Sequence, residues 1–178
     1  AFVDWIIYNM NQKANFNSSV VVVQPLEKGM INVLNEQDGL YHVNLQGLQN
    51  GKAVDNIQLI DVISRGINPY TQYYEYIKLA ENPETRFIIS NTTEAGITFD
   101  PQCKLEDIPA KSYPGKLTQL LYHRFKTFNG APDKGFIIFP CELIFNNGHE
   151  LKKCIEQYIE HWNLGHEFKK WFDTACNI

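Results

Sequence analysis

Short apolar runs without alternation mark three places along the chain where a buried strand is expected. Residues 19–23 read Ser-Val-Val-Val-Val, residues 86–90 Arg-Phe-Ile-Ile-Ser, and residues 135–140 Gly-Phe-Ile-Ile-Phe-Pro. Runs of this length, rich in β-branched and aromatic residues, are typical of strands covered on both faces. The pattern therefore predicts three strands of a mostly parallel sheet.

Segments with helical spacing separate and follow these runs. Apolar residues recur three or four positions apart at the amino end and in four later segments. The later helices are expected at about residues 70–80, from Pro114 to the Asn129-Gly130 pair, at 149–162 and at 165–175. Strands that alternate with crossover helices predict an α/β fold, with helices on both faces of the mostly parallel sheet.

Strict alternation distinguishes residues 40–48 from the rest. Tyr41, Val43 and Leu45 fall on one face and polar residues on the other, which is typical of a half-exposed antiparallel strand. Asn50-Gly51 is a strong hairpin signal, and the second strand is expected to carry Ile57 and Leu59 and to extend as far as Val62. This β-hairpin is an insertion in the α/β rhythm. Residues 27–35 are ambiguous and allow one short helix.

Composition narrows the possible classes of protein. The 178 residues are 44% hydrophobic and 13% aromatic, which is enough for one domain with a substantial core. A net charge of −4 argues against a nucleic-acid partner, and no apolar run is long enough to cross a membrane. The cysteines form no Cys-x-x-Cys pair, so reduced and mostly buried thiols in a cytoplasmic protein are expected. They are Cys103, Cys141, Cys154 and Cys176.

Three polar loops follow the expected buried strands. They are Gln24-Pro25, residues 91–96 and residues 141–148. In open α/β sheets, ligands bind beyond the carboxyl ends of the strands, so these loops are the candidate site. Neither a G-x-G-x-x-G nor a Walker A sequence is present. The five histidines are scattered without a ligand set, so no metal is expected.

Five stretches of the chain together carry a family resemblance. They are Ala-Phe-Val-Asp-Trp at 1–5, Gln-Asp-Gly-Leu-Tyr at 37–41, Ser-Asn-Thr-Thr-Glu-Ala-Gly-Ile at 90–97, Tyr-Pro-Gly-Lys-Leu-Thr at 113–118, and Pro-Cys-Glu-Leu-Ile at 140–144. In this order they resemble the amino-terminal domain of the long-chain mannitol dehydrogenase family, in its uronate branch. The resemblance covers nearly the whole chain.

The resemblance implies a Rossmann-like domain that binds NAD. It also implies hydride transfer between NAD and a sugar acid, with D-tagaturonate and D-altronate interconverted in hexuronate catabolism. Another keto-sugar acid or polyol, such as fructuronate or mannitol, is the alternative within the family. A non-catalytic binding module is the alternative outside it.

Two parts of the family pattern find no match in this sequence. The family's first strand and glycine-rich loop precede the residues that match Ala1, and its helical catalytic domain follows at the carboxyl end. We therefore expect residues 1–178 to be a truncated NAD-binding domain without turnover of its own and with no catalytic residue. The missing strand would expose a sheet edge, which favours self-association.

Cofactor contacts are expected from eight residues. Ala1 would stand at the amino end of a helix that points at the pyrophosphate, and Gln24, followed by Pro25, would contact the adenosine ribose. Residues 91–94 would line the nicotinamide side, or form only a capped turn. The full set is Ala1, Gln24, Pro25, Asn91, Thr92, Thr93, Glu94 and Glu142.

Two further positions in these loops bear on the chemistry. Glu94 is a candidate for tuning proton movement between the site and solvent. Relatives that act on mannitol carry Cys-Asp-Asn where this chain has Cys141-Glu142-Leu143, and the asparagine helps to hold the substrate oxygen. Leu143 cannot donate a hydrogen bond, so that role does not carry over, which argues against mannitol. Glu142 remains a candidate polar contact.

Overall fold

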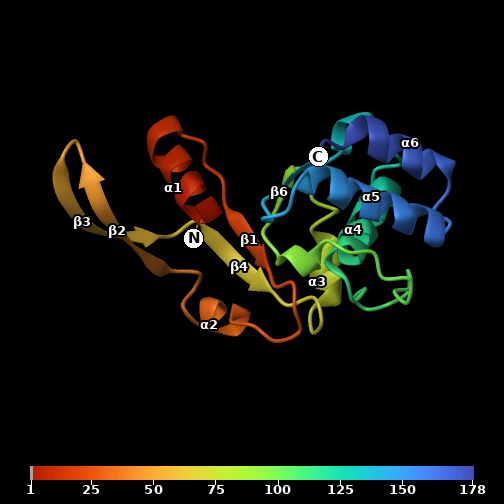
Figure 1. Cartoon of the computed structure of the whole chain (residues 1–178), viewed down its shortest axis with the longest axis horizontal. Helices are drawn as coiled ribbons and strands as arrows, with labels where there is room; N and C mark the ends of the chain where they lie inside the picture. Colours follow the sequence, from red (N-terminus) through yellow and green to blue (C-terminus); the bar gives the residue numbers. More distant parts are fainter. Residues whose placement is uncertain (1) are drawn as a thin grey trace. The chain divides into compact units, whose positions relative to one another are not determined.

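The computed structural model describes residues 2–178, apart from the side chains of Gln49 and Glu94 (Figure 1). The chain divides into two compact units, Ala1–Asn68 and Pro69–Ile178, and each is described by itself.

The first unit holds one pair of parallel strands and a long hairpin. Strand β1 pairs with β4 in parallel, with Val21 opposite Arg65 and Val23 opposite Ile67. The segment that joins β1 to β4 contains a short helix and the hairpin. The elements of this unit are α1 (Phe2–Ala14), β1 (Val20–Val23), α2 (Ile31–Glu36), β2 (Tyr41–Gln49), β3 (Lys52–Ile60) and β4 (Ile63–Ile67).

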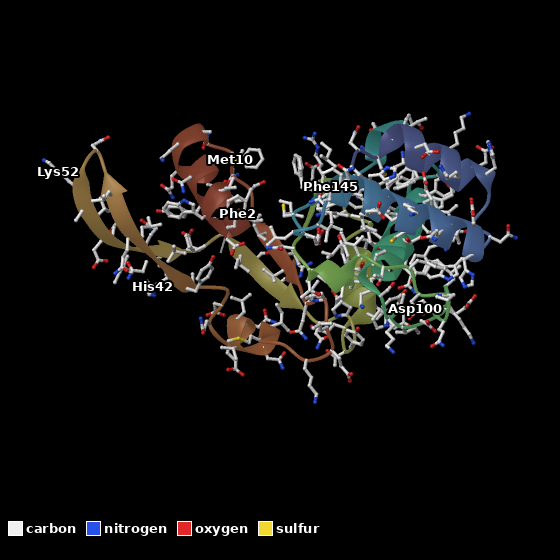
Figure 2. The ribbon with its side chains drawn as sticks, in the orientation of Figure 1. Phe2, Met10, His42, Lys52, Asp100 and Phe145 are labelled. Atoms are coloured by element: carbon white, nitrogen blue, oxygen red, sulfur yellow. The ribbon has the colours of Figure 1, made fainter. Side chains whose placement is uncertain are left out.

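The hairpin confirms the alternation and the turn expected from the sequence. Tyr41, Val43 and Leu45 are half-buried while their neighbours along β2 are exposed. Asn50 and Gly51 both have positive φ, at 53° and 75°, as a two-residue turn of the type favoured in hairpins requires. Lys52 follows at the tip of the hairpin (Figure 2).

Strand β4 was not expected from the sequence, and the extension of the second hairpin strand to Val62 was wrong. Strand β3 ends at Ile60, and the carbonyl of Val62 accepts a hydrogen bond from Val20 N at 2.8 Å at the start of the parallel pair. The polar Ser-Arg-Gly sequence inside β4 hides the strand pattern. Gly66 fits there because the side chain of Ile31 in α2 lies directly against it.

The second unit pairs β5 with β6 in parallel. Phe87 lies opposite Ile137, and Ser90 lies opposite Pro140, so both strands end at the same level. The elements are α3 (Tyr73–Lys78), β5 (Phe87–Ser90), the short 3₁₀ helix η1 (Glu94–Gly96), α4 (Tyr113–Thr127), η2 (Pro132–Lys134), β6 (Ile137–Pro140), α5 (Asn147–His161) and α6 (His166–Ala175). The expected strands and later helices are confirmed, although the helix expected at 70–80 is shorter.

A continuous apolar core fills the second unit between the strands and α4, α5 and α6. Leu121, Phe136, Leu151, Ile155 and Phe168 have no exposed surface. Helix α4 starts where it does because Ser112 Oγ accepts from Gly115 N at 3.0 Å, and Pro114 occupies its first turn. Three of the four cysteines are buried as expected, whereas Cys141 is exposed.

Candidate functional site

The loop after β1 borders an open surface pocket of about 470 Å³ in the first unit, which we call the cavity after β1. Its lining is mostly apolar and comes from the end of β1, the following loop and α2. Residues that line it include Val23, Pro25, Leu26, Ile31, Val33 and Leu34. This volume lies within the range of about 300–1,000 Å³ that is usual for small-molecule pockets.

The Gln24 side chain stabilises the conformation of this loop through hydrogen bonds to its main chain. Its side chain is buried, and its Nε2 donates to the carbonyls of Leu26, at 2.7 Å, and Glu27, at 3.1 Å. Its Oε1 accepts from Ile31 N at 3.3 Å, and Gly29 lies so close that a side chain there would collide with the amide. All of these partners belong to the loop itself or to the start of α2. The expected ribose contact of Gln24 stays a prediction, while Pro25 is exposed at the cavity.

In the second unit, the loops after β5 and β6 are tied to each other by one carboxylate. Glu142 Oε1 accepts from Thr92 N and from Thr92 Oγ1, each at 3.0 Å. Glu142 is only 3% exposed, so its carboxylate lies beneath the loops. The structure thus brings together two of the expected cofactor residues, but they meet each other. Asn91 and Thr93 remain exposed on the same loop.

Three buried oxygen atoms near this tie have no hydrogen-bond partner. They are Ser90 Oγ at the end of β5, Tyr113 OH in the first turn of α4, and Glu142 Oε2. Burial raises the pKa of Tyr113, a weak contact with the Ser90 hydroxyl that falls short of a well-formed hydrogen bond lowers it, and the charge of Glu142 raises it. The Tyr113 phenol is therefore protonated at neutral pH, which makes it a poor general base.

Ser90 and Tyr113 were not assigned a role from the sequence. Both belong to stretches that carry the family resemblance, at 90–97 and 113–118. These motifs were the sequence feature that could have indicated a role for the two residues. Periodicity gives no such signal, because only the paired strand ends and the start of α4 bring these two hydroxyls together with Glu142.

Lys116 is a second buried polar group on the first turns of α4. It is 3% exposed, and its Nζ donates to the Lys111 carbonyl at 2.8 Å and lies 4.9 Å from the centre of the Tyr70 ring. Burial lowers its pKa to about 8. No carboxylate of the described residues forms an ion pair with it, and a carbonyl dipole and an aromatic face stabilise its charge.

The remaining residues of the loop after β6 divide by exposure. Asn147 Nδ2 donates to the carbonyls of Pro140, at 2.7 Å, and Glu142, at 3.1 Å, where α5 begins. Leu143 and Phe145 are 87% and 89% exposed, and Figure 2 marks Phe145 at this end of the unit. A leucine side chain has no hydrogen-bond donor, so the expected loss of the asparagine role at this position stays a prediction.

Two of the expected positions cannot be placed. Ala1 and the side chain of Glu94 lie outside the described residues, so their expected roles at the pyrophosphate and in proton movement stay predictions. Among the side chains that the structure describes, no group of three or more histidine, cysteine, aspartate or glutamate residues is placed to hold a metal ion. Nor does any helix of this described part have the length and apolar character needed to cross a membrane.

Comparison with known proteins finds altronate oxidoreductases among the relatives of this chain. The chain is 73% identical over all 178 residues to altronate oxidoreductase of Bacteroides thetaiotaomicron, and 49% identical over 176 residues to altronate oxidoreductase of Escherichia coli. It covers 37% and 36% of these two relatives, so it spans little more than a third of their length.

Solved structures share the fold at low sequence identity. Mannitol 2-dehydrogenase of Pseudomonas fluorescens, solved as a ternary complex with NAD and D-mannitol, superposes with a TM-score of 0.73 at 17% identity, covering 96% of this chain and 36% of that one. A D-sorbitol dehydrogenase in substrate-free form gives a TM-score of 0.75 at 16% identity, covering 98% of this chain and 37% of that one. The Rossmann-like α/β prediction is therefore confirmed.

The family model for the mannitol dehydrogenase Rossmann domain matches residues 1–178, the whole of the chain. The resemblance inferred from the five sequence stretches is thus confirmed, and this chain belongs to the mannitol dehydrogenase family, as its Rossmann domain.

Proposed function

We propose that the protein is an NAD-dependent oxidoreductase that interconverts D-altronate and D-tagaturonate. The observation that carries this proposal is the 73% identity to an altronate oxidoreductase across every residue of the chain. In this proposal residues 1–178 are the NAD-binding domain, and the proton-transfer groups lie in the carboxy-terminal domain that the family resemblance implies.

The residues of the first unit fit the adenosine half of the cofactor. The cavity after β1 is large enough for a purine ring, and its apolar lining suits a flat aromatic group. Gln24 fixes the loop that forms one wall of the cavity, and Pro25 lies at its surface. Gln24 also supplies a neutral side chain where many NAD enzymes carry an acid.

The residues of the second unit fit the nicotinamide half. Asn91 and Thr93 are exposed at the carboxyl end of β5, where polar groups can orient a bound ring. When bound, NAD supplies the acceptor for the hydride released from the sugar-acid carbon. Thr92 and Glu142 keep the loop that carries Asn91 and Thr93 in one conformation.

The exposed Leu143 favours a sugar acid over mannitol. It stands where relatives that act on mannitol carry an asparagine, and it cannot hold a substrate hydroxyl. The Lys116 cation is buried, so the partner of the substrate carboxylate is expected outside the loops described here. We further propose a cytoplasmic location, supported by four free cysteines, and self-association through a sheet edge.

Side-by-side kinetics of the full-length protein would test the proposal. NADH oxidation would be followed with tagaturonate, fructuronate and fructose. A clear preference for tagaturonate in kcat/KM is expected. Equal or higher kcat/KM with fructuronate would keep the family and overturn the substrate. A folded protein that binds neither NAD⁺ nor NADH would overturn the assignment of the cofactor.

A further inference from the structure

The Glu142 carboxylate is buried without a cation. It lies at the carboxyl end of β6 with 3% of its surface exposed, and no lysine, arginine or histidine of residues 2–178 forms an ion pair with it. A buried charge of this kind destabilises the folded protein, because no opposite charge offsets its desolvation penalty. Its presence therefore calls for a functional explanation.

The two oxygens of this carboxylate have different surroundings. Oε1 accepts from the main-chain nitrogen and the hydroxyl of Thr92, an arrangement of two donors on one oxygen that suits an ionised carboxylate. Oε2 is buried with no partner, near the Ser90 and Tyr113 hydroxyls, which make only a weak contact with each other. The hydrogen bonds from Thr92 therefore explain the position of Oε1. They give no structural role to Oε2 or to the negative charge of the carboxylate.

The position of the carboxylate suggests what the charge does. Strands β5 and β6 end at the same level, and Glu142 is the second residue after β6. Ligands of an open α/β sheet bind beyond this edge. Under the proposed function, on which this inference rests, the nicotinamide ring lies over the loop that Glu142 holds. That ring carries a positive charge in NAD⁺ and none in NADH.

We propose that Glu142 is an electrostatic selector for the redox state of the cofactor: its buried negative charge makes the site bind NAD⁺ more tightly, relative to NADH, than a neutral side chain would. Because the carboxylate is buried, water screens its charge less than at the surface, and we expect about a fivefold difference in Kd, which corresponds to about 1 kcal/mol. Thr92 interacts with Glu142 only through hydrogen bonds.

A neutral replacement of nearly the same shape separates the effect of the Glu142 charge from the effect of its hydrogen bonds with Thr92. In Glu142→Gln the amide oxygen can still accept from Thr92, and the amide nitrogen can donate to the Ser90 and Tyr113 hydroxyls. Dissociation constants for NAD⁺ and for NADH would be measured by calorimetry on the full-length wild type and variant. We expect the ratio Kd(NAD⁺)/Kd(NADH) to rise about fivefold, chiefly through weaker NAD⁺ binding.

Two control variants show whether a change in Kd(NAD⁺)/Kd(NADH) comes specifically from the charge of Glu142. Glu84→Gln removes one negative charge from an exposed side chain and should leave the ratio unchanged. Thr92→Val removes one donor to Oε1 and keeps the carboxylate, so it should weaken the binding of both cofactor forms by the same factor. If Glu142→Gln does not fold, Glu142→Gln combined with Tyr113→Phe gives the new amide more room and provides the same comparison.

The outcomes separate this inference from the function on which it rests. Wild-type protein that binds neither form of the cofactor would overturn the proposed function itself. Tight binding by the wild type, together with an equal loss for NAD⁺ and NADH in Glu142→Gln, would overturn the selector and leave Glu142 as a loop anchor. A rise of the ratio in Glu142→Gln alone would support it.

Discussion

The two units hold their strand-end loops by different means. In the second unit the loops rest on a continuous apolar core formed by the strands and three helices. In the first unit few apolar side chains are fully buried, and side-chain hydrogen bonds to the main chain hold the loops in place to a large extent. Asn35 bonds both the nitrogen and the carbonyl of Gly66, and Gln24 bonds three main-chain groups around its loop.

The buried polar groups differ in the same way. In the first unit, both ends of the Gln24 amide have partners. In the second, Glu142 leaves one oxygen unpaired although its side chain is buried. A buried polar atom without a partner costs about 1–3 kcal/mol. The second unit therefore carries an uncompensated polar cost at the end of β6, whereas the Gln24 amide of the first unit has partners at both ends.

The largest effect is expected from Arg124, the one arginine buried in the second unit's described core. Its Nε donates to the Lys134 carbonyl at 2.6 Å, and its Nη1 to the Asn82 carbonyl at 2.7 Å, while its guanidinium lies 4.4 Å from the centre of the Phe136 ring. Arg124→Met would leave these carbonyls without donors and is expected to cost about 4 kcal/mol in urea unfolding.

Hydrogen exchange would show where that loss falls. Protection should drop across β5, β6 and α4, and remain in β1 and β4. Protection that fell equally in both units would break the comparison, because it would show that they unfold together.

A smaller loss is expected in the first unit from Asn35→Ala. The change removes the bonds to Gly66 N, at 2.7 Å, and Gly66 O, at 3.0 Å, which join α2 to β4. We expect about 2 kcal/mol less stability for β1, α2 and β4, measured as faster amide exchange in residues 20–36 and 63–67. Exchange rates unchanged from wild type would show that apolar packing alone fixes this unit.

Two glycine substitutions compare the loops directly. A methyl group at Gly96 would collide with the short side chain of Thr92, and one at Gly29 would collide with the longer Gln24 amide. Neither glycine requires a positive φ, so the effect of alanine is steric. Gly96→Ala and Gly29→Ala are each expected to cost about 2 kcal/mol, because each methyl group displaces a side chain that hydrogen bonds hold in place. Thermal unfolding of the two variants checks this, and a loss of stability in only one of them would contradict it.

The smallest effect is a pH dependence from Lys116. Its pKa is about 8 in the folded protein and higher in the unfolded chain, so the unfolded state binds more protons between about pH 8 and 10. Stability relative to Lys116→Met should therefore rise by about 1 kcal/mol as the pH increases across this range. Unfolding measured for both proteins at pH 7, 8, 9 and 10 checks this; a flat or falling difference would contradict it.

Much of the fold followed from local patterns in the sequence. The Asn50-Gly51 turn and the alternation of β2 are local, so the hairpin could be predicted, and so could the apolar runs of β5 and β6. Strand β4 could not, because its Ser-Arg-Gly segment has no strand pattern and is made a strand by pairing with β1. The loops after β1, β5 and β6 were correctly placed as polar segments at strand ends.

The chemistry inside those loops depended on contacts between distant residues. By itself the sequence determined the family, the α/β order and the identity of the loops, because motifs and periodicity are properties of neighbouring residues. Only the tertiary structure decided that Gln24 bonds to its own loop, and that Glu142 meets Thr92, 50 residues earlier, beside the unpaired Ser90 and Tyr113 hydroxyls. Burial and hydrogen-bond partners arise when strand ends and helix starts are brought together, and no local pattern encodes them.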